Sequence, residues 1–253
     1  TRVGRIICQT CAKHLKPALL ELGGKAPFLV LDDADIDAAV NAATFGAFAN
    51  SGQICMSTER FVVDNKVADE FIAKFAAKAS SLPLGDPRKG PVVLGSVVDL
   101  ATVERCNAMI DDALAKGAKI VCGGKAESTL MPATLIDHVT PAMRIFHEET
   151  FGPVKGIVRV NGEEEAIATA NDNEFGLSSA VFTRDTARGW RVAARIEAGI
   201  CHINGPTVHD EAQMPFGGVK ASGYGHFGGQ QGINAFTETR WVTMQTAERH
   251  YPF

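Results

Sequence analysis

Two short stretches of the chain carry residues that could do chemistry together. FANSGQICMS, residues 48–57, places Cys55 just after a Ser-Gly break, and LELGGKAP, residues 20–27, places Glu21 just before a Gly-Gly pair. A thiol on a connection between two elements can be reached by a small molecule, and its thiolate is a nucleophile. A carboxylate crowded by neighbouring backbone loses solvation, so its pKa rises toward the range that a general base needs.

Each of these residues, taken alone, has a simpler explanation. A single cysteine is more often part of a core, and a glutamate before a strand is more often in solvent. Cys106 illustrates the first case, because it lies on the apolar stripe of a predicted helix and is expected to be buried. Cys8 and Cys11 form one isolated pair without further ligands, so a structural role is favoured over zinc or redox chemistry. The sequence therefore predicts no metal site.

Composition limits the classes of function. The chain has 253 residues, 45% of them hydrophobic and 21% charged, which is typical of a globular protein. A formal net charge of −4 without a basic cluster argues against a nucleic acid or membrane-surface partner, and no apolar run is long enough to span a membrane. Six unevenly spaced cysteines favour a reducing, cytoplasmic setting without disulfides.

Helical and extended patterns alternate along the chain. The apolar run 26–32 predicts a buried strand, and the segment after it begins with Asp33, Asp35 and Asp37, which can cap a helix that ends at Ser51-Gly52. Further strands are predicted at 60–64, 119–124, 133–139, 154–160, 178–183 and 199–205, and further helices at 67–82, 100–114, 163–173 and 186–197. This alternation predicts an α/β fold with a largely parallel sheet flanked by helices.

The end of the chain has a different character. Glycine occurs seven times between Met214 and Gly232, which predicts a loop folded tightly against something else. After it, FTETRWVTMQT (236–246) alternates polar and apolar residues as a strand does. A terminal strand with no later partner in the sequence is a candidate for pairing with another subunit.

Six blocks in order carry a resemblance to a known family. LELGGKAP and FANSGQICMS are followed by EETFGPV (148–154), NDNEFGLSSAVFT (171–183), GICHING (199–205) and MPFGGVKASGYG (214–225). Over essentially its whole length the chain resembles the catalytic-domain half of the aldehyde dehydrogenase superfamily. Its last fifty residues look most similar to bacterial members that act on aromatic aldehydes of the salicylaldehyde, vanillin and benzaldehyde kind.

The resemblance implies roles for both reactive residues. Cys55 would attack the aldehyde carbonyl to give a thiohemiacetal, and its backbone N–H would supply half of an oxyanion hole. Loss of a hydride to NAD or NADP would leave a thioester. Glu21 would activate the water that hydrolyses this thioester and releases the carboxylic acid.

The same resemblance implies a coenzyme side and a substrate side of the site. Glu149 would hold the nicotinamide ribose and Phe151 would lie against the same region, with Gly4, Leu22 and Gly23 nearby. The substrate pocket is predicted from residues around the cysteine and from the later blocks. These predicted pocket residues are Ile54, Met56, Asn204, Val208, His209 and Phe216.

The family's enzymes are longer, and their N-terminal half has no counterpart in this chain. We expect residues 1–21 to be a remnant of the dinucleotide-binding domain, 22–232 to be the catalytic domain, and 233–253 to be an oligomerisation strand and tail. The expected assembly is a homodimer or homotetramer formed through that strand. Residues 1–253 alone are expected to be an inactive fragment. Two alternatives stay open at this point: a non-catalytic structural or subunit-association module, and a cofactor-free thiol esterase.

Overall fold

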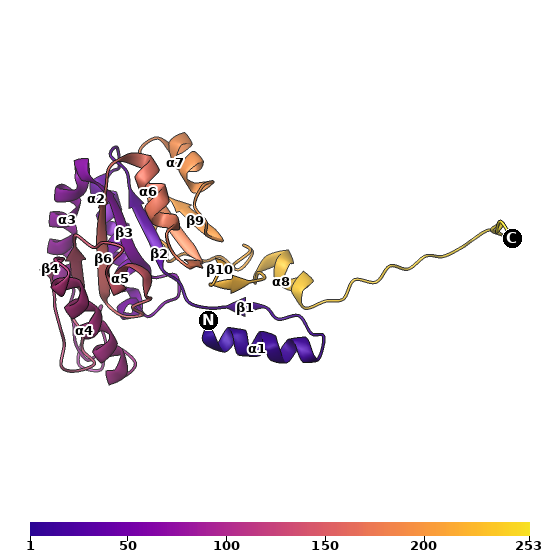
Figure 1. Ribbon diagram of the computed structural model, residues 1–253, viewed down its shortest axis with the longest axis horizontal. Coiled ribbons are helices and arrows are strands. Elements are labelled where there is room, and N and C mark those ends of the chain that lie inside the picture. The colour runs from indigo at the N-terminus through magenta and orange to yellow at the C-terminus, as the bar shows by residue number, and fades with distance from the viewer.

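A seven-stranded sheet forms the centre of the computed structural model, which describes residues 1–253 (Figure 1). Its strand order is β4-β5-β6-β3-β2-β8-β9, and every neighbouring pair is parallel except β4 and β5. The strands are β2 (Ala26–Val30), β3 (Thr58–Asp64), β4 (Lys119–Cys122), β5 (Thr134–Asp137), β6 (Val154–Val160), β8 (Ser178–Phe182) and β9 (Ile200–Ile203). The predicted α/β fold with a largely parallel sheet is confirmed.

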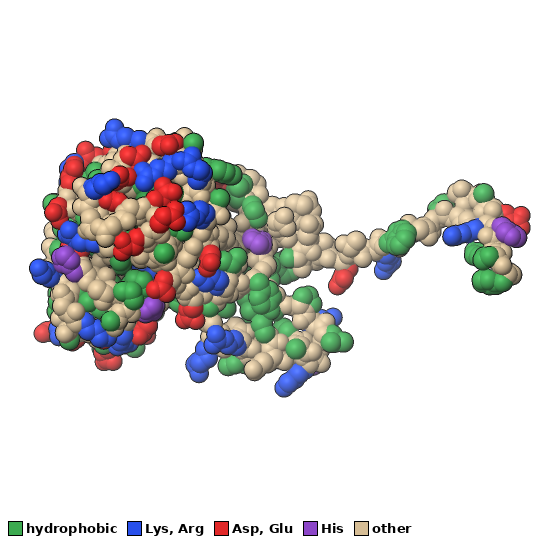
Figure 2. Space-filling view, turned by 45° about the horizontal axis from the view of Figure 1, so that its top comes forward, with side chains coloured by type: hydrophobic (Ala, Val, Ile, Leu, Met, Phe, Trp, Pro, Cys, Tyr) green, Lys and Arg blue, Asp and Glu red, His purple; other side chains and the backbone are tan.

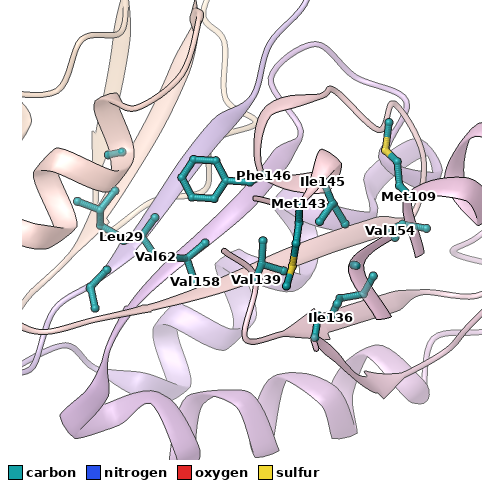
Figure 3. Packing of buried hydrophobic residues seen from close by; sticks show 14 of the residues in the cluster. Leu29, Val62, Met109, Ile136, Val139, Met143, Ile145, Phe146, Val154 and Val158 are labelled. Atoms are coloured by element: carbon teal, nitrogen blue, oxygen red, sulfur yellow. The ribbon is translucent and has the colours of Figure 1, made fainter. Parts of the chain in front are cut away.

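Helices cover both faces of this sheet. One face carries α2 (Ile36–Phe48) and α3 (Asn65–Ser80), and the other carries α4 (Leu100–Ala115), α5 (Arg144–His147), α6 (Gly162–Asn171) and α7 (Thr186–Ala193). Successive side chains of a strand point to opposite faces, so Leu29 of β2 packs under the second group of helices while Phe28 and Val30 pack under the first. Figure 3 shows the core under the second group, α4 to α7, where Leu29, Val62 and Val158 lie near Phe146.

The helix starts follow the sequence pattern. The N-cap residue of α2 is Asp35, whose carboxylate accepts a hydrogen bond of 3.1 Å from Ala38 N–H, as the run of aspartates predicted. The other end of α2 passes into a short 3₁₀ turn, Ala49–Gly52. Within that turn Asn50 and Ser51 take left-handed backbone angles, which reverse the chain sharply toward β3. Cys55 lies on this reversal.

The segments with candidate chemistry all precede parallel strands. Glu21 to Gly24 come before β2, Cys55 comes before β3, and Glu149 comes before β6. Parallel strands begin at the same edge of a sheet, so these three segments converge on its amino-terminal edge. Four short strands close that edge in two antiparallel pairs. They are β1 (Leu20–Glu21) with β11 (Gly223–Tyr224), and β7 (Phe175–Gly176) with β10 (Val219–Lys220).

The two ends of the chain lie to one side of the three-layer body. Helix α1 (Arg2–Lys13) and the short helix α8 (Gly229–Ala235), which the glycine-rich sequence did not predict, lie beyond the edge that β1 occupies (Figure 1). After Phe236 the chain pairs with no strand of its own and extends away from the body, leaving Trp241 89% exposed. The expected pairing of this segment with another subunit stays a prediction.

Charges of both signs are interspersed over the face of the body seen in Figure 2, in keeping with the mild net charge of −4. None of the helices combines the length and the apolar character that a membrane crossing would require.

Candidate active site

Glu21 has lost most of its solvent at the carboxylate. Both of its carboxylate oxygens are buried without a hydrogen-bond partner. Burial raises the pKa of Glu21 to about 7, and the nearby Gly218 N–H offsets this effect only in part. A carboxylate with such a pKa can take up a proton near neutral pH. The raised pKa expected from the crowded glycine motif is present.

The glycine-rich segment forms the wall that crowds Glu21. Ser222, which is fully buried, donates a hydrogen bond of 2.7 Å from its hydroxyl to Gly23 O and accepts one of 3.0 Å from Gly176 N–H. Its carbonyl oxygen accepts a further bond from Leu22 N–H at 3.0 Å. Gly223 has a φ of +115°, and a Cβ there would collide with Leu20 O, so only glycine fits. The segment thus fixes the backbone of the glutamate motif on both sides.

Cys55 is half-buried on the connection between α2 and β3. Burial raises the pKa of its thiol, and the negative charges of Glu21 and Glu149 raise it further. The thiol is therefore protonated at neutral pH in this chain, and a base must take its proton before it can act as a nucleophile. Cys106, by contrast, is fully buried in the core, as its place on the helical stripe predicted.

Gly23 and Gly24 bring the three segments into contact. Gly24 N–H donates a hydrogen bond of 2.8 Å to Glu149 Oε1. A Cβ on Gly24 would collide with the carbonyl oxygen of Cys55, and one on Gly23 would lie 2.8 Å from Glu149 Oε2. The glycine pair is thus required for close backbone approach, and it places Cys55 and Glu149 on either side of the glutamate motif.

The residues predicted for a coenzyme form a connected surface. Gly4 is buried on α1 and packs against Leu22, where a Cβ would lie 2.8 Å from a methyl carbon. Glu149 Oε2 has no hydrogen-bond partner within the chain, so it can accept one from a ligand hydroxyl such as that of a ribose. Phe151 follows with a strained φ of +43° and is 37% exposed. A hollow of about 520 Å³ between α1 and the β1–β11 pair adjoins them, with Leu22 in its lining.

The residues that flank the cysteine are held by a contact that the sequence did not reveal. Ile54 and Met56 are half-buried beside Cys55. Thr207 donates a hydrogen bond of 2.7 Å to Met56 O and lies 2.8 Å, Oγ1 to Oγ1, from Thr58. Val208 is next in the chain and half-buried. No local pattern marks Thr207, because its partners are about 150 residues away in the sequence.

The other predicted pocket residues are not brought to the cysteine. His209 and Phe216 line a separate hollow of about 410 Å³ beside β9, whose lining does not include Cys55. Asn204 lies beyond the carboxyl end of β9, at the edge opposite the cysteine. Its amide donates to Thr183 O at 3.0 Å and accepts from Thr183 N–H at 3.1 Å, so both of its polar groups are used to hold a turn.

A buried charge network lies directly behind the site and was missed by sequence reasoning. Glu59 accepts hydrogen bonds from Lys25 at 2.8 Å and from Lys155 at 2.9 Å, and all three residues are at most 2% exposed. It also accepts bonds from Thr150 N–H at 2.9 Å and Thr150 Oγ1–H at 2.7 Å. The available signal was the presence of charged residues inside apolar strand patterns. A charge buried in such a strand is costly unless it has a partner, so each of these residues must have one.

The fold and this arrangement belong to a known class of protein. Residues 1–242 match the aldehyde dehydrogenase family, which is nearly the whole chain, and the protein is a member of that family.

Within the family the chain is similar to proteins named for aromatic aldehydes. It is 61% identical to a vanillin dehydrogenase from Pseudomonas fluorescens, over 100% of this chain and 52% of the relative. The crystal structure of a salicylaldehyde dehydrogenase from Pseudomonas putida G7, complexed with salicylaldehyde, superposes with a TM-score of 0.97 at 56% identity, covering 100% of this chain and 52% of that one. An NADP-dependent glyceraldehyde-3-phosphate dehydrogenase from Bacillus halodurans C-125, complexed with NADP, gives a TM-score of 0.86 at 39% identity over 89% of this chain and 47% of that one. The chain spans about half the length of the curated relatives that it matches.

Proposed function

We propose that this chain supplies the nucleophile and the general base of an NAD- or NADP-dependent oxidation of an aromatic aldehyde to its carboxylic acid. The observation that carries the proposal is that the buried Glu21 carboxylate lies close enough to Cys55 to raise the pKa of its thiol, while Gly24 packs against the backbone carbonyl oxygen of Cys55. Membership of the aldehyde dehydrogenase family supports the reaction class.

The chain's own atoms account for the covalent steps. The sulfur of Cys55, once deprotonated, forms a bond to the carbonyl carbon and gives a thiohemiacetal. A coenzyme held by Glu149 and Phe151 would supply the acceptor for the hydride of this carbon, which would leave a thioester on Cys55. Glu21 then takes a proton from water, whose oxygen attacks the thioester carbonyl and displaces the thiol, releasing the acid. The pKa of about 7 makes Glu21 a base that is half-ionised at neutral pH.

Two residues are proposed to hold the coenzyme near Cys55. Glu149 has one oxygen fixed by Gly24 N–H and a second without a partner in the chain, which suits a ribose hydroxyl. Phe151 beside it offers a partly exposed ring to the same region. The choice between NAD and NADP is left to measurement, and the relative complexed with NADP is one reason to test both.

An aromatic substrate is proposed on two grounds. The relatives at 56–61% identity are named for vanillin and salicylaldehyde. Ile54 and Met56 flank the thiol with apolar side chains, and a thioether packs well on an aromatic ring. We propose Ile54, Met56 and Val208 as ring contacts, with His209 and Phe216 further out along the approach. Asn204 is proposed to act on this region only through the turn that it holds.

The test is a direct assay of coenzyme reduction. The complete protein is incubated with NAD+ or NADP+ and either vanillin or hexanal, and the reduced coenzyme is followed by its absorbance. We expect vanillin to give at least a tenfold higher kcat/KM than hexanal, and Cys55→Ala to abolish the reaction. Cys122→Ala is the matched control, since Cys122 lies on the edge strand β4 and lines neither of the two hollows described above. Full activity in the Cys55 variant would refute the proposed nucleophile.

A further inference from the structure

Thr150, between the two residues proposed to hold the coenzyme, is fixed at every polar group. Its N–H and hydroxyl both donate to the carboxylate of Glu59, at 2.9 and 2.7 Å. Its carbonyl oxygen accepts a hydrogen bond of 3.0 Å from the Arg105 guanidinium of α4. Thr150 is fully buried, whereas Phe151 is 37% exposed. The backbone between Glu149 and Phe151 is therefore anchored through Thr150 to two buried or partly buried charged residues, Glu59 and Arg105.

The anchor restrains a strained piece of backbone. Phe151 has a φ of +43°, in the left-handed region that a bulky side chain rarely adopts. Such a conformation persists only where the surrounding contacts enforce it. On one side of Phe151 the enforcing contacts are the bonds from Thr150 to Glu59. On the other side is Gly152, whose carbonyl oxygen packs against Gly52.

Glu59 is held in turn by two buried cations. Lys25 donates to its Oε2 and Lys155 to its Oε1. Although burial alone would raise the pKa of Glu59, the two lysines hold it down at about 2, so the carboxylate stays ionised. Lys25 directly follows the Gly23-Gly24 pair, so the network also reaches the glutamate motif.

The thiol side of the site has supports that do not involve Glu59. Ser57, two residues after Cys55, donates to Gly46 O at 3.1 Å. Thr207 donates to Met56 O at 2.7 Å. Lys155, which donates to Glu59, also donates to the Ser57 hydroxyl at 3.1 Å, so the network reaches the cysteine side through one lysine. The dependence on Glu59 is still unequal, because Thr150 is bonded to the Glu59 carboxylate itself, whereas the cysteine connection keeps its bonds to Gly46 O and from Thr207.

We propose that Glu59 is a positioning residue for the coenzyme side of the site, acting through Thr150 on Glu149 and Phe151. It touches neither substrate nor coenzyme. This inference rests on the proposed function, because it assumes that Glu149 and Phe151 hold a coenzyme.

The test substitutes Glu59→Gln in the complete protein and separates the two sides of the site. The glutamine side chain has nearly the same volume as glutamate, but an NH₂ group replaces one of the two oxygens that accept hydrogen bonds. Part of the bonding between residue 59 and Thr150 is therefore lost. We expect the KM for the coenzyme to rise about tenfold, while the rate at which iodoacetamide modifies Cys55 without coenzyme stays within twofold. Amide hydrogen exchange of residues 149–152 should accelerate at least tenfold. Glu148→Gln is the matched control. Glu148 directly precedes Glu149 in the sequence, but its side chain bonds only the surface residue Arg144.

Two results would overturn the proposal. One is a coenzyme KM within twofold of the wild type. The other is an equal fold-change in coenzyme KM and in Cys55 modification, which a general loosening of the structure would cause. If Glu59→Gln fails to fold, Thr150→Val is the deciding variant, because it removes the hydroxyl bond to Glu59 and keeps the bond from the backbone N–H. An unchanged KM for the coenzyme would exclude the positioning role, whereas a threefold rise supports it.

The proposed function can fail separately. If the wild-type protein reduces no coenzyme with any aldehyde, the reaction is wrong, yet hydrogen exchange at 149–152 in Glu59→Gln still decides the positioning role. Unchanged exchange there overturns it, and faster exchange confined to that segment supports it.

Discussion

Replacing Glu21 by glutamine should change how the stability of the protein depends on pH. In the folded chain burial raises the pKa of Glu21 from its ordinary value of 4.5 to about 7. The folded state therefore holds this proton more tightly than the unfolded state does. Stability from this group is fully present below about pH 4.5 and is lost as the pH rises through about 7.

The size of the effect follows from the shift in pKa. A shift from 4.5 to about 7 corresponds to about 3 kcal/mol if the site were fully dry. Glu21 is only half-buried, so solvent screening reduces this to about 1.5 kcal/mol. About 1 kcal/mol of that loss falls between pH 5 and pH 8. Glutamine does not titrate, so the Glu21→Gln variant should lack this part of the pH dependence.

The assay is urea unfolding of wild type and variant at pH 5 and pH 8, with near- and far-ultraviolet circular dichroism required to give the same midpoint. With an m value of about 3 kcal/mol/M, the midpoint difference between the two proteins should change by about 0.3 M between the two pH values. The cost of placing an uncharged amide in the site is the same at both pH values and cancels.

Glu148→Gln is the control for the substitution itself. The hydrogen bonds from Arg144 lower the pKa of Glu148, so it is ionised in both the folded and the unfolded state above pH 5 and adds no slope. If Glu21→Gln and Glu148→Gln gave the same pH dependence, Glu21 would not be desolvated. The argument that makes it a base near pH 7 would then fail.

Two further substitutions test the packing of the site, and one measurement on the wild type tests the pKa of the thiol. Gly24→Ala places a methyl group against the carbonyl oxygen of Cys55. It should lower the free energy of unfolding by about 2 kcal/mol and remove most of the activity, and a variant as stable and active as wild type would contradict the close approach. Thr207→Val removes the hydrogen bonds to Met56 O and Thr58, and should cost about 2 kcal/mol by urea unfolding, while a change below about 0.3 kcal/mol would show that these bonds are not maintained. In wild type the rate at which iodoacetamide modifies Cys55 should still be rising above pH 9, because burial and the neighbouring carboxylates raise the pKa of its thiol; a plateau below pH 8 would contradict this.

The order of strands and helices could be predicted from the sequence because it follows from local patterns. The apolar run at 26–32 and the aspartates after it are sufficient to predict β2 and the start of α2. The short strands β1, β7, β10 and β11 were not predicted, since each has two residues and exists only through its partner. The helix α8 was missed for another reason: glycine-rich sequence has low helix propensity and gives no helical pattern.

Residues of the site could be predicted only where they lie in a recognisable sequence motif. The raised pKa of Glu21 was expected from the glycine pair beside it, and burial supplies it. The partners of Glu59 were not predictable, because Thr150 and Lys155 are more than 90 residues away and any buried charge could have satisfied the same requirement. Asn204 shows the converse problem: it was predicted from the resemblance alone, and the motif gave no sign that its amide bonds Thr183 beyond β8.

The hydrogen bond from Ser222 to Gly23 O also has a consequence for the order in which the chain folds. The two residues are 199 positions apart, and β1 likewise can pair only once β11, near the other end of the chain, has been made. During synthesis β2 and β3 can pair as soon as residue 64 has left the ribosome, but the environment of Glu21 cannot close until residues 217–224 are available. The sheet forms early, and the carboxylate acquires its raised pKa last. A nascent or truncated chain ending before residue 217 would therefore carry Cys55 and Glu21 without the surroundings that raise the pKa of Glu21.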